Sequence, residues 1–209
     1  MQQDLSDQMA DVLKRYLALC ESPENQRNRR FWANADDPWL IERWRGISAT
    51  PTGAFTMALD MAGYATVLGI DTAAYYGQAE AQLYEQMRYQ LWEHENLRSN
   101  RFFEKNAFVS FGACYSASLF GAQIEFPPGQ APWVNMKKPL LAERRDLDKM
   151  HTIELDAHGL GPRTHAFYQR MRELCAGSGI TVRYPTVIRG PFSVATQLRE
   201  TTNLLMDML

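Results

Sequence analysis

Apolar residues recur with helical spacing at the start of the chain. Within residues 3–20 they fall at Leu5, Met9, Val12, Leu13, Tyr16, Leu17 and Leu19. This spacing predicts an amphipathic helix with Asp4 or Ser6 as its N-cap. The next segment, residues 21–38, is polar and rich in turn formers, and we interpret it as a connection that precedes a short helix over Trp39–Trp44. The pattern therefore predicts an N-terminal helical extension over residues 1–50.

Three short apolar runs bounded by turn residues predict strands after this extension. They are Ala54–Asp60, Asn106–Phe111 and Ile180–Ile188. A short hairpin strand is also expected over Gln123–Phe126, continued by Trp133–Val134. Helical spacing fills the segments between, at residues 61–68, 74–96 and 162–176, and again after Pro191. Strands that alternate with helices predict an α/β protein with parallel strands.

The third strand ends in Arg189-Gly190-Pro191, and a helix pattern starts at once. In α/β folds ligands bind at the carboxyl ends of strands, where helix N-termini offer unpaired N–H groups. The sequence thus favours a binding site near Arg189. A tight Gly-Pro turn without any ligand explains the same residues equally well.

Three patches of the chain resemble one known family. The first is Val67-Leu68-Gly69-Ile70-Asp71 with Tyr75-Tyr76, the second is Leu119 to Pro127 (LFGAQIEFP), and the third is GPFSVATQLRETTNLLMDML from Gly190 to Leu209. In this order they are similar to segments of the uroporphyrinogen decarboxylase superfamily, which includes the corrinoid-dependent methyltransferases. Glu200 stands where that family usually has a glycine.

The resemblance implies an α/β fold, the (β/α)8 TIM barrel of that superfamily. Such a barrel needs eight strands and about 250 residues, whereas this chain has 209 residues. Its last residue, Leu209, also lies inside an apolar helix pattern. We therefore expect an incomplete (β/α)8 barrel, with residues 51–209 forming its first βα units and the rest truncated. An incomplete barrel would have an open strand edge. The chain would then be marginally stable, pair with another copy as a homodimer, or owe its end to truncation.

Two departures from the family pattern bear on its activity. Uroporphyrinogen decarboxylases carry an Arg-rich signature where this chain has Leu59-Asp60-Met61-Ala62-Gly63-Tyr64, and fixed guanidinium groups are what a substrate with eight carboxylates requires. The aspartate that the family carries after its second strand falls on Gly112. These differences favour corrinoid-linked methyl transfer to a thiol over decarboxylation. A non-catalytic half-barrel remnant that binds a small molecule remains an alternative, because a fold does not determine a function.

The residues expected at the barrel mouth are Asp60, Cys114, Tyr115, Arg189 and Arg199, as contacts to a substrate or tetrapyrrole. Each has a simpler explanation. Asp60 can serve as a helix N-cap, Cys114 can be a buried structural cysteine, and the two arginines can form surface salt bridges. The resemblance assigns zinc and a corrinoid to the complete protein, with the zinc ligands beyond Leu209. We expect no cofactor within this chain and no activity of this fragment alone.

Charge and composition narrow the range of partners. A net charge of −2 gives no electrostatic reason to expect nucleic acid or an anionic membrane surface. The partners we expect are a small-molecule or tetrapyrrole ligand and a corrinoid protein. The N-terminus lacks the pattern of a signal peptide, and three widely spaced cysteines do not form a disulfide framework, so we expect a cytoplasmic protein. His151, His158 and His165 recur every seven residues, but the glycines between them argue against a shared metal site.

Overall fold

The computed structural model describes residues 2–33, 57–97, 99–150, 152–184 and 189–208. The chain divides into two compact units. The first contains Met1–Leu59 and Tyr84–Asn106, and the second contains Asp60–Leu83 and Ala107–Leu209. The expected helix over Trp39–Trp44 lies outside the described residues.

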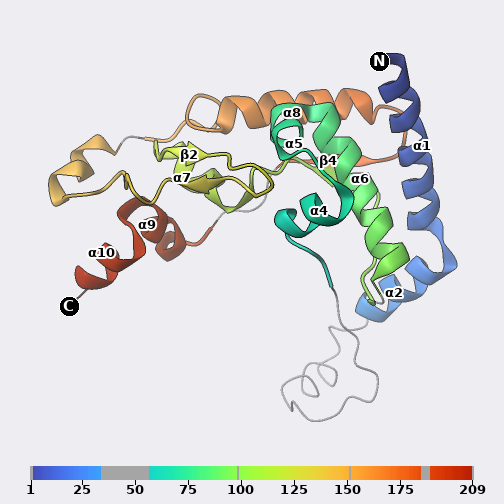
Figure 1. The fold of residues 1–209 in the computed structure, drawn as a ribbon, viewed down its shortest axis with the longest axis horizontal. Coiled ribbons are helices and arrows are strands. Elements are labelled where there is room, and N and C mark those ends of the chain that lie inside the picture. Colours follow the sequence, from blue (N-terminus) through green and yellow to red (C-terminus); the bar gives the residue numbers. More distant parts are fainter. Residues whose placement is uncertain (1, 34–56, 98, 151, 185–188, 209) are drawn as a thin grey trace, which may run out of the picture. The chain divides into compact units, whose positions relative to one another are not determined.

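The first unit is built from helices. It contains α1 (Gln2–Glu21), α2 (Pro23–Ala33) and most of α6 (Ala79–Asn96). Helix α1 lies beside α6 (Figure 1), and the buried Tyr16 hydroxyl donates to Gln90 Oε1 at 2.9 Å. The apolar face predicted for residues 3–20 forms part of this core, with Met9, Val12, Tyr16 and Leu19 buried. The helix begins at Gln2, ahead of both expected caps.

The interpretation of residues 21–38 as a connection is wrong for the described part. Helix α2 begins at Pro23, since proline suits the first helical position and Ser22 Oγ accepts from Asn25 N at 3.1 Å. Asn25 is buried, and its side chain explains why the helix folds here. Its amide donates to the carbonyl oxygens of Cys20 and Phe103 and accepts from Phe103 N. One buried residue in this otherwise polar helix, Asn25, therefore holds the helix in place through its hydrogen bonds.

The second unit alternates short helices and strands. Its helices are α4 (Met61–Leu68), α5 (Thr72–Gly77), α7 (Tyr115–Leu119), α8 (Gly161–Leu174), α9 (Pro191–Arg199) and α10 (Thr201–Met206), with 3-10 helices η1 (Gly112–Cys114) and η2 (Arg144–Lys149). Strands β2 (Ile124–Glu125) and β3 (Trp133–Val134) form the expected hairpin, antiparallel with Ile124 opposite Val134. The long helix expected over residues 74–96 is interrupted, because Gln78 adopts an extended conformation between α5 and α6.

The second and third expected strands lie side by side. Strand β1 (Asn106–Phe108) pairs with β4 (Thr181–Arg183), and Val109 N donates to Arg183 O. An antiparallel register through that bond would place β1 opposite residues beyond Arg183, outside β4. The observed ranges therefore fit a parallel pair, in which both strands end at the same edge.

The described residues form a mixed fold dominated by helix, with few and short strands. No closed barrel is present among them, and residues 57–60, the described end of the first expected strand, are not in a strand. The third expected strand is shorter than Ile180–Ile188, and its last positions, Val187 and Ile188, lie outside the described residues. In the described part of the chain, no helix has the length and apolar character needed to cross a bilayer.

Candidate functional site

Buried hydroxyl groups gather beyond the carboxyl ends of β1 and β4. Tyr115 begins α7 shortly after β1, Tyr184 directly follows β4, and Thr164 lies in α8. The hydroxyl oxygens of all three are buried, and none has a hydrogen-bond partner in the described structure. An unpaired buried hydroxyl costs about 1–3 kcal/mol. We refer to Tyr115, Thr164 and Tyr184 as the hydroxyl cluster.

The hydroxyls of Tyr184 and Thr164 lie near enough to Tyr115 to act on its pKa, although no pair among the three has the geometry of a hydrogen bond. Burial raises this pKa well above its usual value, and the Tyr184 hydroxyl and the Asp156 carboxylate raise it further. The Thr164 hydroxyl acts in the opposite direction. Tyr115 is therefore neutral at physiological pH, and its hydroxyl can donate to or accept from a polar group. It contains no group that would act as a base.

Close packing between α7 and the start of α8 fixes the cluster. Ser118 Oγ donates to Tyr115 O and accepts from Leu160 N. Gly159 approaches this helix so closely that an added Cβ would lie 2.1 Å from Ser118 O. A side chain at position 159 would therefore separate the two segments that carry Tyr115 and Thr164.

Helix α9 closes a second side of the segment after β1. Gln197 is buried and donates from Nε2 to Ala113 O at 3.3 Å, while its Oε1 has no partner in the part of the chain that the structure describes. Arg189 N donates to Ser116 Oγ at 3.4 Å. The backbone just before α9 is thus tied to α7, which follows β1.

Asp60 has the structural role that the sequence left open. Its carboxylate accepts from Gly63 N at 2.8 Å and caps α4. The residue is exposed. Its position is therefore explained by the helix start.

Cys114 is a buried cysteine rather than a reactive one. Its thiol donates to Phe111 O at 3.2 Å, and burial raises its pKa to about 11. A thiol with this pKa is protonated at neutral pH, whereas the thiolate is the nucleophile and metal ligand. The neighbouring Gly112 has a φ of +70°. A side chain at Gly112 would begin 3.6 Å from Pro132 O.

The two arginines have different environments. Arg189 is exposed, and among the described residues its backbone N–H is tied to the site through Ser116. Arg199 binds Asp207 through Nε at 2.8 Å and donates from Nη1 to the carbonyl oxygens of Leu141 and Ala142. Arg199 therefore ties the end of α10 to the loop at Leu141, and it does not reach the hydroxyl cluster through any of these bonds.

The histidines do not form a metal site in the described ranges. No three His, Cys, Asp or Glu side chains gather closely enough there to hold a metal ion. His158 Nδ1 accepts from Glu154 N, and His165 pairs with Gln169 and Asp156. His151 lies outside the described residues.

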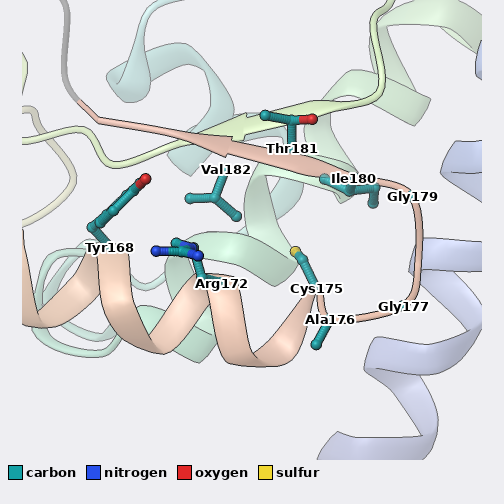
Figure 2. Close-up of a pocket in the computed structure, with 9 residues that line it drawn as sticks. All are labelled: Tyr168, Arg172, Cys175, Ala176, Gly177, Gly179, Ile180, Thr181 and Val182. Carbon is teal, nitrogen blue, oxygen red and sulfur yellow. The ribbon is translucent and has the colours of Figure 1, made fainter.

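A cavity of about 560 Å³ lies between α8 and β4. Figure 2 shows Val182 and Cys175 turned into the space between helix and strand, with Thr181 on the opposite face of the strand. The Arg172 guanidinium lies 5.6 Å from the centre of the Tyr168 ring, and that ring packs on Tyr184 at 5.3 Å. Burial raises the pKa of Cys175 to about 11, so this thiol is also protonated. The cavity therefore borders the hydroxyl cluster through Tyr168 without offering a nucleophile.

Comparison with protein-family models, with curated proteins and with solved structures finds no match to this chain. The site therefore has to be interpreted from its own geometry.

The sequence indicated Tyr115 but not its companions. Thr164 sits inside a helix pattern, Tyr184 follows a strand, and Gln197 occupies a helix that was interpreted through its apolar residues. Nothing in their spacing distinguishes them from surface positions. Only the pairing of β1 with β4 and the close contact at Gly159 bring them to the same place.

Proposed function

We propose that this chain is the N-terminal part of a uroporphyrinogen decarboxylase superfamily barrel whose complete protein transfers a methyl group from a corrinoid to a thiol. The three sequence patches motivate the family. The hydroxyl cluster is the observation that carries the site, because it lies where two neighbouring parallel strands end. Unpaired buried hydroxyls in such a position are typical of a place that a ligand or water completes.

The residues of this chain would bind rather than react. The corrinoid supplies the methyl group when it is bound. Tetrapyrrole rings carry carboxylate or amide groups at their edge, and neutral hydroxyls can donate to either. Tyr115, Thr164 and Tyr184 would hold one such group and exclude water from it. Arg189, exposed beside them, would meet a second polar group of the ligand.

Zinc does not fit the residues described here. No donor set for a metal is present among them, and both thiols near the strands, Cys114 and Cys175, are buried and protonated. In this proposal the zinc ligands belong to a part of the protein outside this chain. We derive no chemical step from zinc.

Decarboxylation is the less favourable alternative. It needs a carboxylate near the centre of the site, and the position that the resemblance assigns to it is Gly112. A side chain there would meet a backbone φ of +70° and the Pro132 carbonyl oxygen at 3.6 Å from its first carbon.

A non-catalytic binding half-barrel is the second candidate, and one observation favours it. Cys114, the sole thiol among the expected mouth residues, is protonated and hydrogen-bonded to a backbone carbonyl. The site described here would then retain ligand binding without any chemistry. The downstream reading frame separates the two candidates. A His-x-Cys after a later strand supports the methyltransferase, and a stop codon after Leu209 supports the remnant.

The test is a methyl-transfer assay on the complete protein. Methylcobalamin and a small thiol are supplied, the S-methyl product is measured by mass spectrometry, and zinc content is determined alongside. We expect product in the wild type and a roughly tenfold or greater loss in a Tyr115→Phe/Thr164→Val variant with unchanged zinc content. Arg172→Gln, on the same helix as Thr164, is the control and should retain activity. Absence of both product and zinc from the wild type would overturn the methyl-transfer proposal.

A further inference from the structure

A half-buried arginine, Arg163, lies in the second unit, next to Thr164 along α8, and no described residue supplies it with an anionic partner. The guanidinium carbon of Arg163 lies 5.4 Å from the ring centre of Phe111, 5.3 Å from that of Phe126 and 5.8 Å from that of Phe167. In the part of the chain that the structure describes, no carboxylate or carbonyl oxygen accepts a hydrogen bond from it. Arginine has five N–H donors in a fixed fork, so this arrangement leaves all of them available.

The electrostatics agree with the geometry. Burial lowers the pKa of Arg163, and no charged group among the described residues acts on it. The aromatic faces compensate part of the lost hydration through cation–π contacts, but they accept no N–H···O bonds. Arginine is seldom buried without a paired anion. These surroundings therefore fit a cation whose paired anion comes from a bound ligand.

Arg163 opens into a cavity of about 340 Å³. The walls come from two separate segments, residues 70–76 and 126–129, and they are mainly apolar, with Ile70, Tyr76, Phe126, Pro127 and Pro128. Thr72 Oγ1 accepts from Gly129 N at 2.9 Å and holds the two segments together. A cavity of this size with apolar walls and one convergent charged group has the character of a small-molecule site.

The charges select the ligand class. One guanidinium neutralises one negative charge and matches a carboxylate through two parallel N–H···O bonds. A phosphate would bring nearly two negative charges, and the exposed Asp71 carboxylate at the cavity wall would oppose the excess. Tyr76 and Phe126, whose rings lie 6.1 Å apart edge to face, offer contacts to a flat apolar body.

We propose that this cavity binds a small monocarboxylate with an aromatic or apolar body, its carboxylate on Arg163 and its body against Tyr76 and Phe126. The site is independent of the proposed methyl transfer. It also gives a role to Phe126 and Pro127, which the sequence singled out only as part of a family-like patch.

The experiment uses the 209-residue chain and 4-fluorophenylacetate, observed by ¹⁹F NMR line broadening in a titration. We expect saturable binding with a dissociation constant in the millimolar range or below. The uncharged amide of the same compound and 4-fluorobenzylphosphonate are the ligand controls, and both should bind at least about tenfold more weakly. Equal binding of acid and amide overturns the proposal, because the guanidinium would then contribute nothing. Tighter binding of the phosphonate overturns the choice of a carboxylate.

Variants locate the site. Arg163→Gln should weaken binding of the acid roughly ten- to hundredfold, since it removes a charge-assisted pair. Arg172→Gln is the matched control, because that guanidinium also lies over a tyrosine ring of α8 but does not line this cavity, and it should bind as the wild type does. Thermal unfolding checks that Arg163→Gln folds. If it does not fold, the comparison of acid, amide and phosphonate on the wild type decides alone, and saturable binding that is unchanged in a folded Arg163→Gln variant contradicts the site.

Discussion

Two buried tyrosine hydroxyls, those of Tyr16 and Tyr115, differ in their hydrogen bonds. Tyr16 donates to Gln90 Oε1 at 2.9 Å and also lies 2.7 Å from Glu104 O. The Tyr115 hydroxyl has no partner among the described residues. The same substitution therefore has opposite consequences at the two positions.

We expect Tyr16→Phe to lower the free energy of unfolding by about 1–2 kcal/mol, since it removes the donor to the buried Gln90 Oε1. Tyr115→Phe should change it by less than about 0.5 kcal/mol or stabilise the chain, because only an unpaired hydroxyl is removed. Urea denaturation of both variants measures the difference. A loss at Tyr115 as large as that at Tyr16 would show that its hydroxyl is bonded in solution.

Glu93 gives the first unit a pH dependence. It is 2% exposed and pairs with Arg101 at 2.5 Å. Burial raises its pKa from 4.5 to about 7, against the opposing effect of Arg101. The folded state thus holds a proton more tightly than the unfolded state does. This contribution to stability is fully present below the unfolded pKa and is lost as the pH rises through about 7.

We predict that Glu93→Gln flattens this dependence. The variant should lose less thermal stability than the wild type between about pH 5 and about pH 8, because its amide cannot ionise. Melting temperatures across that range measure the effect, and Glu95→Gln, an exposed neighbour on the same helix, is the control. Parallel curves for wild type and Glu93→Gln would place the pKa of Glu93 near its ordinary value instead.

The sequence predicts residues of this kind poorly. Asn25 and Gln82 both pair with backbone amide groups as a neighbouring strand would, Gln82 through Ser110 N and Ser110 O. A pattern of hydrophobic and polar positions assigns both residues to the surface. Their burial depends on chain segments that lie far away in sequence, so no local signal announces it. Tyr115 could be indicated by its place after the second expected strand, whereas Thr164 lies inside an expected helix and Tyr184 inside the third expected strand.

At the scale of elements, the junction between α9 and α10 carries a strained residue. Glu200 has a φ of +69°, a conformation that favours glycine, and the family that the chain resembles has a glycine there. Its carboxylate accepts from Thr202 N and Asn203 N and caps α10. The cap offsets part of the strain in this chain.

Glu200→Ala should therefore lower the free energy of unfolding, because it loses the cap and keeps the strain. The free energy of unfolding of Glu200→Gly should be about 1 kcal/mol or more higher than that of Glu200→Ala, since glycine relieves the backbone strain. Denaturant titration of the two variants beside wild type measures this order. Equal stability of both variants would mean that the backbone at this position carries no strain.

The two glycines at the start of α8 and just before it, Gly161 and Gly159, should tolerate no added side chain. A Cβ at Gly161 would lie 1.6 Å from Leu155 O, and one at Gly159 would lie 2.1 Å from Ser118 O. We expect Gly159→Ala to destabilise the chain by about 2 kcal/mol or more, through both the clash and the φ of +54°. Gly121→Ala is the control for φ alone, because Gly121 has a φ of +98° in open space. A smaller loss at Gly159 than at Gly121, measured by urea denaturation, would contradict the close contact.

Elements with strong periodicity were predictable. The apolar faces of α1, α6 and α8 and the hairpin of β2 and β3 follow local patterns that tertiary packing did not override. The strand over Ala54–Asp60 was not confirmed at its described end, since Asp60 caps α4 and the residues before it are not in a strand. Helix α2 was missed because its polar residues concealed one buried asparagine.

At the scale of the whole molecule, the pairing of β1 with β4 links segments more than seventy residues apart in the second unit. This pairing brings Tyr184, directly after β4, and the segment after β1 that carries Tyr115 to one edge, where they form part of the hydroxyl cluster. The strand order could be expected only from the resemblance, because local sequence does not determine which strands become neighbours. The account depends on that edge being a place where a ligand binds.

Equilibrium dialysis of the 209-residue chain against hydroxocobalamin tests this claim most directly. The wild type is predicted to retain the corrinoid, and the Tyr115→Phe/Thr164→Val variant, folded by the criterion of its melting temperature, is predicted to bind it at least about tenfold more weakly. Equal retention by both proteins, or none by the wild type at millimolar concentration, would contradict it.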